Sequence, residues 1–198
     1  RGITQTLLDP QPVVGVLEME KIKKTEKEIR EFRVSNDALG DGEELRRRLG
    51  EEGYVFLQGV MERDKLMGLR GEIMGVLMEA GWLEEGTDPL EGIARQGAQC
   101  TEGDVEYAEV YHRMYSLEAF HRAGHWPEVL GVMEQVIGGE VLPHPHKIAR
   151  LWFPQYTEHT TPRHQDFVHF QGSFETYTFW APVGDCPIEL GGLAMLPG

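Results

Sequence analysis

The residues best suited to chemistry are a histidine and an aspartate separated by one residue, in the run Arg-His-Gln-Asp-Phe at positions 163–167. The adjoining stretch 166–170 is short and rich in aromatic and aliphatic residues, which predicts a strand. Side chains two residues apart on a strand point to the same face, so the imidazole of His164 and the carboxylate of Asp166 can converge on one ion. The spacing therefore predicts a metal site.

One imidazole and one carboxylate occupy two positions of the facial triad found in non-haem Fe(II) oxygenases. The positions that remain after a second imidazole binds are open to a keto acid and O₂. A histidine-x-aspartate triplet is common in proteins, so its meaning depends on the sequence around it. The neighbouring motifs must distinguish a metal site from an ordinary polar surface.

Those motifs are a tryptophan, Trp180, on the next predicted strand and the run Gly-Gly-Leu-Ala-Met-Leu-Pro-Gly at 191–198. With the His-Gln-Asp triplet, they resemble the phytanoyl-CoA dioxygenase family in both order and spacing. That family has the same triplet, a tryptophan on the next strand and a Gly-x-Leu-x-x-x-Pro-Gly segment. The resemblance extends back to Gly53 and the strand-like run Tyr54–Leu57, and it covers residues from about 40 to 198.

The resemblance implies a mononuclear Fe(II) enzyme that uses 2-oxoglutarate as co-substrate and releases succinate and CO₂ while it hydroxylates a small organic substrate. It assigns His164 and Asp166 to the iron. It places Gln165 in the 2-oxoglutarate pocket as a hydrogen-bond donor and Trp180 as a wall of that pocket. The family's second iron-binding histidine and its 2-oxoglutarate-binding arginine are expected beyond Gly198.

Two further residues are candidates for the co-substrate pocket. Arg150, with Lys147 nearby in sequence, can offer positive charge to a carboxylate of 2-oxoglutarate. Tyr111, next to His112, lies roughly where the resembling family supplies another polar contact. Each of these side chains is equally compatible with an ordinary surface position.

A second metal site is conceivable in the histidine-rich stretch that starts at His144-Pro145-His146, since clustered imidazoles bind zinc or copper. We expect these histidines to be solvated loop residues instead, because proline makes the segment rigid and extended. His169 is an odd number of residues from His164 and would face away from it on a strand. It is therefore left out of the predicted site. The remaining histidine of this stretch is His159.

The elements that must position these residues change in character along the chain. Three- and four-residue apolar spacing and glycine stops predict helices at 43–52, 61–80, 117–123 and 127–137. Short apolar runs bounded by turn residues predict strands at 54–57, 148–153, 166–170, 177–182 and 193–196. Helices followed by strands indicate an α+β fold. With the resemblance, this predicts a double-stranded β-helix barrel at 40–198, backed by helices, incomplete at its C-terminus and preceded by an N-terminal extension at 1–39.

Composition limits the possible partners. The 198 residues carry a formal net charge of −14, which repels nucleic-acid phosphates and argues against nucleic-acid binding. No apolar run approaches the roughly 20 residues that a membrane span needs, so a cytoplasmic protein without a membrane partner is expected. Cys100 and Cys186 are far apart and are expected to be reduced thiols. Nucleophile-elbow, P-loop and dinucleotide-binding motifs are absent from the sequence.

Two functions other than catalysis are compatible with the same sequence. A cupin-like module could bind a metal or ligand without oxygenase activity. A degenerate member of the resembling family could serve as an interaction protein. Release of succinate from 2-oxoglutarate separates an oxygenase from both.

Overall fold

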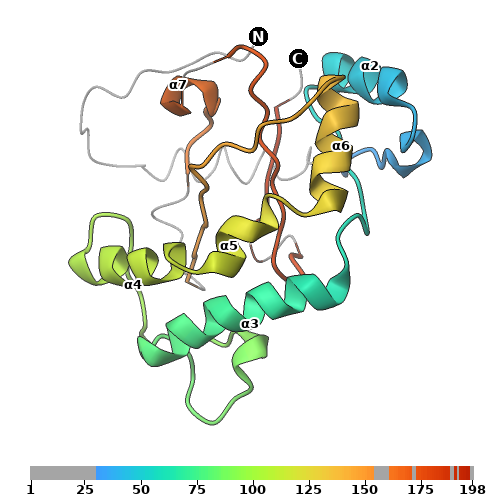
Figure 1. The fold of residues 1–198 in the computed structure, drawn as a ribbon. Helices are drawn as coiled ribbons and strands as arrows, with labels where there is room; N and C mark the ends of the chain where they lie inside the picture. Colours follow the sequence, from blue (N-terminus) through green and yellow to red (C-terminus); the bar gives the residue numbers. More distant parts are fainter. Residues whose placement is uncertain (1–29, 154–160, 171–172, 188–189, 191, 197–198) are drawn as a thin grey trace.

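The computed structural model of the protein describes residues 30–153, 161–170, 173–187, 190 and 192–196 (Figure 1). Most of the expected N-terminal extension, together with Gly191, Pro197 and Gly198 of the C-terminal motif, lies outside these residues. The described chain contains the helices α2 (Gly42–Glu52), α3 (Arg63–Glu79), α4 (Val105–Tyr115), α5 (Glu118–Ala123), α6 (Pro127–Ile137) and α7 (Phe167–Phe170), with short 3₁₀ turns η2 (Asn36–Ala38) and η3 (Pro89–Glu91).

Local signals set the ends of the helices that the sequence predicts. Helix α2 begins after Asp41, whose side chain accepts a hydrogen bond from the backbone N–H of Glu44 at 3.1 Å. It ends at Gly53, whose φ of 77° is a left-handed conformation that glycine adopts without strain. Helix α6 has Pro127 in its first turn and ends in the same way at Gly138. The prediction of these two helices, and of α3 and α5, is confirmed.

The main hydrophobic core lies where α3 meets α4, with α5 alongside (Figure 1). Helix α3 buries four side chains at three- and four-residue spacing, as an amphipathic helix does. Facing them are the buried residues of α4 and the segment between the two helices. The buried cluster consists of Leu69, Ile73, Val76, Leu77, Trp82, Leu83, Cys100, Tyr107, Val110 and Met114.

A second contact joins α2 to α6 and brings together segments about ninety residues apart. The guanidinium of Arg46 donates to the backbone carbonyl of Gln135 at 2.6 Å, and the Gln135 side chain accepts the N–H of Gly40 at 2.7 Å. Gly42 permits this approach, because a Cβ atom there would lie 3.0 Å from the Gln135 carbonyl oxygen. Leu45 is fully buried on α2.

Arg48 fixes the start of the described chain to α2. Its side chain is only 6% exposed and makes two parallel 2.7 Å hydrogen bonds with the carboxylate of Asp37. A third 2.7 Å bond goes to Glu44 one turn earlier on the helix. A planar guanidinium that meets a carboxylate with two bonds is geometrically specific, so η2 is held against α2 in one orientation.

The prediction of a double-stranded β-helix barrel is wrong for the part of the chain that the structure describes. That part is helical and otherwise irregular, and its only strand-like pairing consists of two isolated bridges, Val34 with Phe56 and Leu83 with Ala94. The expected strands at 148–153, 177–182 and 193–196 form no ladder. The expected strand at 166–170 is instead the short helix α7.

Tyrosines of α4 hold the backbone of the stretch 145–151. Tyr107, Tyr111 and Tyr115 are four residues apart, and their rings stack with centroids 5.9 and 6.2 Å apart. Two of the hydroxyls bond backbone groups of the stretch: Tyr115 donates to the Pro145 carbonyl at 3.5 Å, and Tyr111 accepts from the Ala149 N–H at 3.3 Å. This segment therefore finds partners on a helix rather than on another strand.

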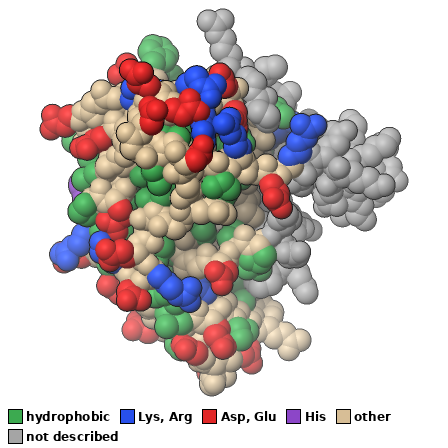
Figure 2. Space-filling view, turned by 90° about the vertical axis from the view of Figure 1, so that its right-hand side faces the viewer, with side chains coloured by type: hydrophobic (Ala, Val, Ile, Leu, Met, Phe, Trp, Pro, Cys, Tyr) green, Lys and Arg blue, Asp and Glu red, His purple; other side chains and the backbone are tan. Residues whose placement is uncertain are grey.

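Surface charge, helix length and the two cysteines can each be compared with what the sequence predicts. Acidic side chains are spread across the face shown in Figure 2, with basic side chains among them. Among the described helices, none combines the length and apolarity needed to span a lipid bilayer. Cys100 and Cys186 are both free thiols, and burial raises the pKa of Cys100 to about 11, which disfavours a reactive thiolate there.

Truncating the core between α3 and α4 should lower stability sharply. Met114 is fully buried, so Met114→Ala should reduce the free energy of unfolding by about 2–5 kcal/mol. The control Leu142→Ala changes a side chain that is 90% exposed and should alter it by less than about 0.5 kcal/mol. Urea unfolding followed by circular dichroism measures both. Equal effects of the two variants would show that α4 does not pack as described.

The ion pairs of Arg48 with Asp37 and Glu44 should make the free energy of unfolding depend on pH in the acid range. Hydrogen bonding to Arg48 lowers the pKa of Asp37 from 3.8 to about 2, and bonding to Arg47 and Arg48 lowers the pKa of Glu44 from 4.5 to about 2. The stabilisation is therefore complete above about pH 4.5 and is lost as pH falls towards 2. In urea unfolding between pH 5 and 2.5, the wild type should lose more stability than Asp37→Asn/Glu44→Gln. Parallel losses in the two proteins would contradict this account.

Candidate metal-binding site

His164 and Asp166 converge in the structure, although not on a strand. The distance from His164 Nε2 to Asp166 Oδ1 is 3.0 Å. Asp166 stands just before α7, and its backbone carbonyl accepts the N–H groups of His169 at 2.9 Å and Phe170 at 3.1 Å. Asp166 thus sits in the turn that starts α7, and His164 precedes this turn by two residues. The prediction that this segment is a strand is wrong. The two side chains nevertheless lie close together.

Neighbouring groups orient both side chains. His164 Nδ1 lies 2.8 Å from the backbone carbonyl of Pro162, and a carbonyl only accepts, so Nδ1 carries a hydrogen and donates. Nε2 is then the nitrogen that faces the carboxylate. The other carboxylate oxygen, Asp166 Oδ2, accepts a hydrogen bond from the hydroxyl of Thr178. Supporting bonds of this kind fix the ligands of metal sites.

This arrangement leaves one position, between His164 Nε2 and Asp166 Oδ1, that a proton or a cation can occupy. The imidazole of His164 has an acceptor on each side, the Pro162 carbonyl and the Asp166 carboxylate. A neutral ring that donates from Nδ1 would point its Nε2 lone pair at a carboxylate oxygen. Either a second proton on the ring or a cation bound by both atoms removes this repulsion.

The separation of the two atoms suits a shared cation. Ligands about 2.1 Å from one ion, in adjacent positions of an octahedron, lie about 3.0 Å apart. The observed 3.0 Å between Nε2 and Oδ1 matches this value and is also the length of a hydrogen bond. The side chains of His164 and Asp166 are 35% and 30% exposed, so an ion can reach them from solvent.

His169 lies beside the pair without joining it. Its ring centroid is 5.4 Å from that of His164, with the planes at 76°. The strand argument that turned His169 away from His164 fails, because α7 is a helix. Within the residues that the structure describes, however, no three His, Cys, Asp or Glu side chains are placed to hold one ion. An ion bound by His164 and Asp166 would therefore need further ligands.

The four residues expected around 2-oxoglutarate are dispersed. Trp180 is two residues beyond Thr178 and is 43% exposed, and Gln165 is exposed between the two donors. Arg150 forms an ion pair with Glu102. The Tyr111 hydroxyl is taken by the backbone of Ala149. In the described chain, no hydrogen bond links any of the four expected residues to His164 or Asp166.

The alternative site at His144 and His146 has an unsuitable tautomer. His144 Nδ1 accepts the backbone N–H of His146 at 3.1 Å, so the hydrogen of the neutral ring is on Nε2. Binding a metal through Nε2 would require moving that hydrogen and breaking the bond. His146 packs against Phe170, with ring centroids 5.1 Å apart. His159 lies outside the described residues.

Sequence reasoning missed Thr178 and the Pro162 carbonyl, which orient the two donors. A hydroxyl residue two positions before Trp180, on the same predicted extended run, was the available signal for Thr178. A backbone carbonyl has no sequence signal. Sequence reasoning also missed the helix α4, whose signal was the four-residue spacing of Tyr107, Tyr111 and Tyr115.

Comparison with known proteins adds no assignment. No protein-family model matches the chain, and no solved structure matches it significantly. The functional argument therefore rests on the chemistry of the site.

Removing the Tyr111 hydroxyl should loosen the segment that leads towards the site. Tyr111→Phe leaves the Ala149 N–H without its partner and should reduce the free energy of unfolding by about 1–2 kcal/mol. Tyr115→Phe removes a bond that is long at 3.5 Å and should cost less than about 0.5 kcal/mol. Hydrogen exchange of the Ala149 amide, with urea unfolding, measures the effect. Unchanged protection of that amide in Tyr111→Phe would refute the role of this hydroxyl.

Proposed function

We propose that the protein is an Fe(II)- and 2-oxoglutarate-dependent dioxygenase that hydroxylates a small organic substrate, as its resemblance to the phytanoyl-CoA dioxygenase family implies. The observation that supports this most is the 3.0 Å distance between His164 Nε2 and Asp166 Oδ1. The Pro162 carbonyl orients the imidazole, and the Thr178 hydroxyl orients the carboxylate. The proposal depends on this site and not on a barrel fold, since one chemistry can occur on different folds.

Each residue of the site has a defined task in the proposal. His164 Nε2 and Asp166 Oδ1 supply two adjacent ligands, an imidazole and a carboxylate, which suit ferrous iron. The Pro162 carbonyl keeps the hydrogen of His164 on Nδ1, so that Nε2 stays available. The Thr178 hydroxyl holds Asp166 Oδ2 and leaves Oδ1 for the ion. Bound iron would supply the activation of O₂ that accompanies conversion of 2-oxoglutarate to succinate and CO₂.

The co-substrate would bind beside the pair. In the sequence, Gln165 stands between the two donors, and Trp180, whose side chain is exposed, follows Thr178 by two residues. We retain both as contacts of 2-oxoglutarate. Arg150 can serve a carboxylate only if it leaves Glu102, since the two form an ion pair. Tyr111 has a structural partner in Ala149 and is the weakest of the four candidates.

The test is an anaerobic titration of the purified protein with Fe(II) and 2-oxoglutarate. The wild type should develop the weak visible charge-transfer band of the ternary complex. His164→Ala and Asp166→Ala should abolish the band, because each removes a ligand. Thr178→Val should weaken Fe(II) binding about 10- to 100-fold, since it removes the bond that orients Asp166. The control His144→Ala, outside the pair, should behave like the wild type.

A second measurement separates catalysis from binding. In air, the wild type should release succinate from 2-oxoglutarate, and Asp166→Ala should not. Iron binding without succinate would indicate a metal-binding module instead. Absence of both, or equal iron affinity in the wild type and His164→Ala, would rule out the proposed oxygenase.

A further inference from the structure

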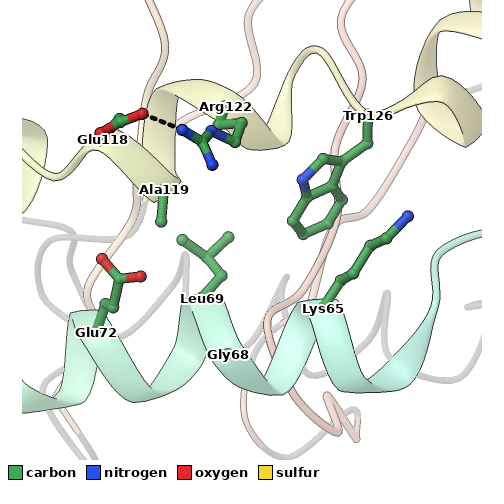
Figure 3. Close-up of a pocket in the computed structure, with 8 residues that line it drawn as sticks. All are labelled: Lys65, Gly68, Leu69, Glu72, Glu118, Ala119, Arg122 and Trp126. Carbon is green, nitrogen blue, oxygen red and sulfur yellow. Dashed lines mark hydrogen bonds and ion pairs between the residues drawn. The ribbon is translucent and has the colours of Figure 1, made fainter.

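A groove separate from the metal-binding pair lies between α3 and α5 and has a volume of about 320 Å³ (Figure 3). That volume is within the range of small-molecule sites. Its floor is Leu69, a buried residue of the main core, and small residues at Gly68 and Ala119 leave the space above it open. At one end, the indole of Trp126 points towards α3 beside Lys65 (Figure 3).

The charges around the groove are not balanced. Lys65 is bound to Glu128 at 3.0 Å, and Arg122 forms an ion pair with Glu118. Both basic groups therefore already have acidic partners. Glu72 stands on α3 at the other end, with its carboxylate directed towards α5 (Figure 3). In the part of the chain that the structure describes, Glu72 makes no ion pair and no hydrogen bond.

The groove thus combines an apolar floor, an aromatic wall and one carboxylate without a partner. Lys65 and Glu72 are seven residues apart on α3, so the two ends are separated by about 10 Å. A ligand of that length with an apolar body and one positive end fits both ends. The body would lie over Leu69 against Trp126, and the cation would meet Glu72. The net charge of −14 also favours a cation over an anion.

We propose that this groove is a binding site for a small organic cation, an ammonium group carried on an aromatic or aliphatic body. The ammonium pairs with Glu72, and the apolar body covers Leu69 and the face of Trp126. The site requires no metal and is independent of the proposed oxygenase activity.

A series of probes with one aromatic body tests the charge preference. Calorimetric titrations of the metal-free protein would use 2-phenylethylamine, which is a cation at pH 7, the neutral 2-phenylethanol and the anionic 3-phenylpropionate. The amine should bind saturably and at least about threefold more tightly than either of the others. Glu72→Gln should remove most of this difference, because it keeps the shape of the side chain and removes its charge.

A matched pair of glycine variants tests the location. A Cβ atom at Gly68 meets nothing within 4 Å, and the same is true of Gly50 on α2, which does not line the groove. Both sites are exposed and helical, and leucine is a better helix former than glycine. Gly68→Leu should fill the groove and weaken amine binding at least about tenfold, while Gly50→Leu should leave it unchanged.

Three results would overturn the proposal: no saturable binding of the amine, equal affinities for the three probes, or equal effects of Gly68→Leu and Gly50→Leu. Because the titrations need no iron, their outcome is distinct from the test of the oxygenase.

Discussion

The account of this protein depends on one imidazole held between two groups that can only accept hydrogen bonds. The Pro162 carbonyl lies 2.8 Å from His164 Nδ1, and a carboxylate oxygen of Asp166 lies 3.0 Å from Nε2. A neutral ring satisfies only one of them. The second must be satisfied by a proton or by a cation, and a ligand separation of about 3.0 Å suits an octahedral ion. His164 Nε2, the atom that needs a proton or a cation beside it, is therefore also the atom that the proposal assigns to the metal.

The segment that carries His164 and Asp166 is linked to the hydrophobic core through α4 and the stretch 145–151. Helix α3 forms the base of the core, and α4 packs on it through Tyr107, Val110 and Met114. Tyr115 and Tyr111 of α4 then bond the backbone at Pro145 and Ala149. His146 from that stretch contacts Phe170 of α7, the helix that begins directly after Asp166. A chain of packed rings thus connects the core to the site.

The helices α2, α3, α5 and α6 were predictable because their signals are local, whereas α4 was missed and α7 was expected as a strand. Three- and four-residue apolar spacing located α3, and left-handed glycines at Gly53 and Gly138 marked where α2 and α6 end. Strands depend on a partner elsewhere in the chain, which composition does not specify. The stretch 148–153 has strand-like residues, yet the backbone N–H of Ala149 donates to the Tyr111 hydroxyl on a helix.

The candidate site was predictable in part. The spacing of His164 and Asp166 identified two side chains that do lie together, although the segment that carries them leads into the helix α7 and is not a strand. The same strand argument turned His169 away from His164, whereas the two ring centroids lie 5.4 Å apart. Thr178 was missed, because its place two residues before Trp180 does not itself show that it contacts Asp166, twelve positions away. The binding of a metal by this pair stays a prediction.

The most direct test of the central claim is the ¹⁵N NMR spectrum of the histidine side chains as zinc, a diamagnetic substitute for iron, is added. The account predicts that the Nε2 signal of His164 moves to a metal-bound position while its Nδ1 stays protonated, with His144 unchanged. A zinc-dependent change at His144 with none at His164, or binding of His164 through Nδ1, would contradict it.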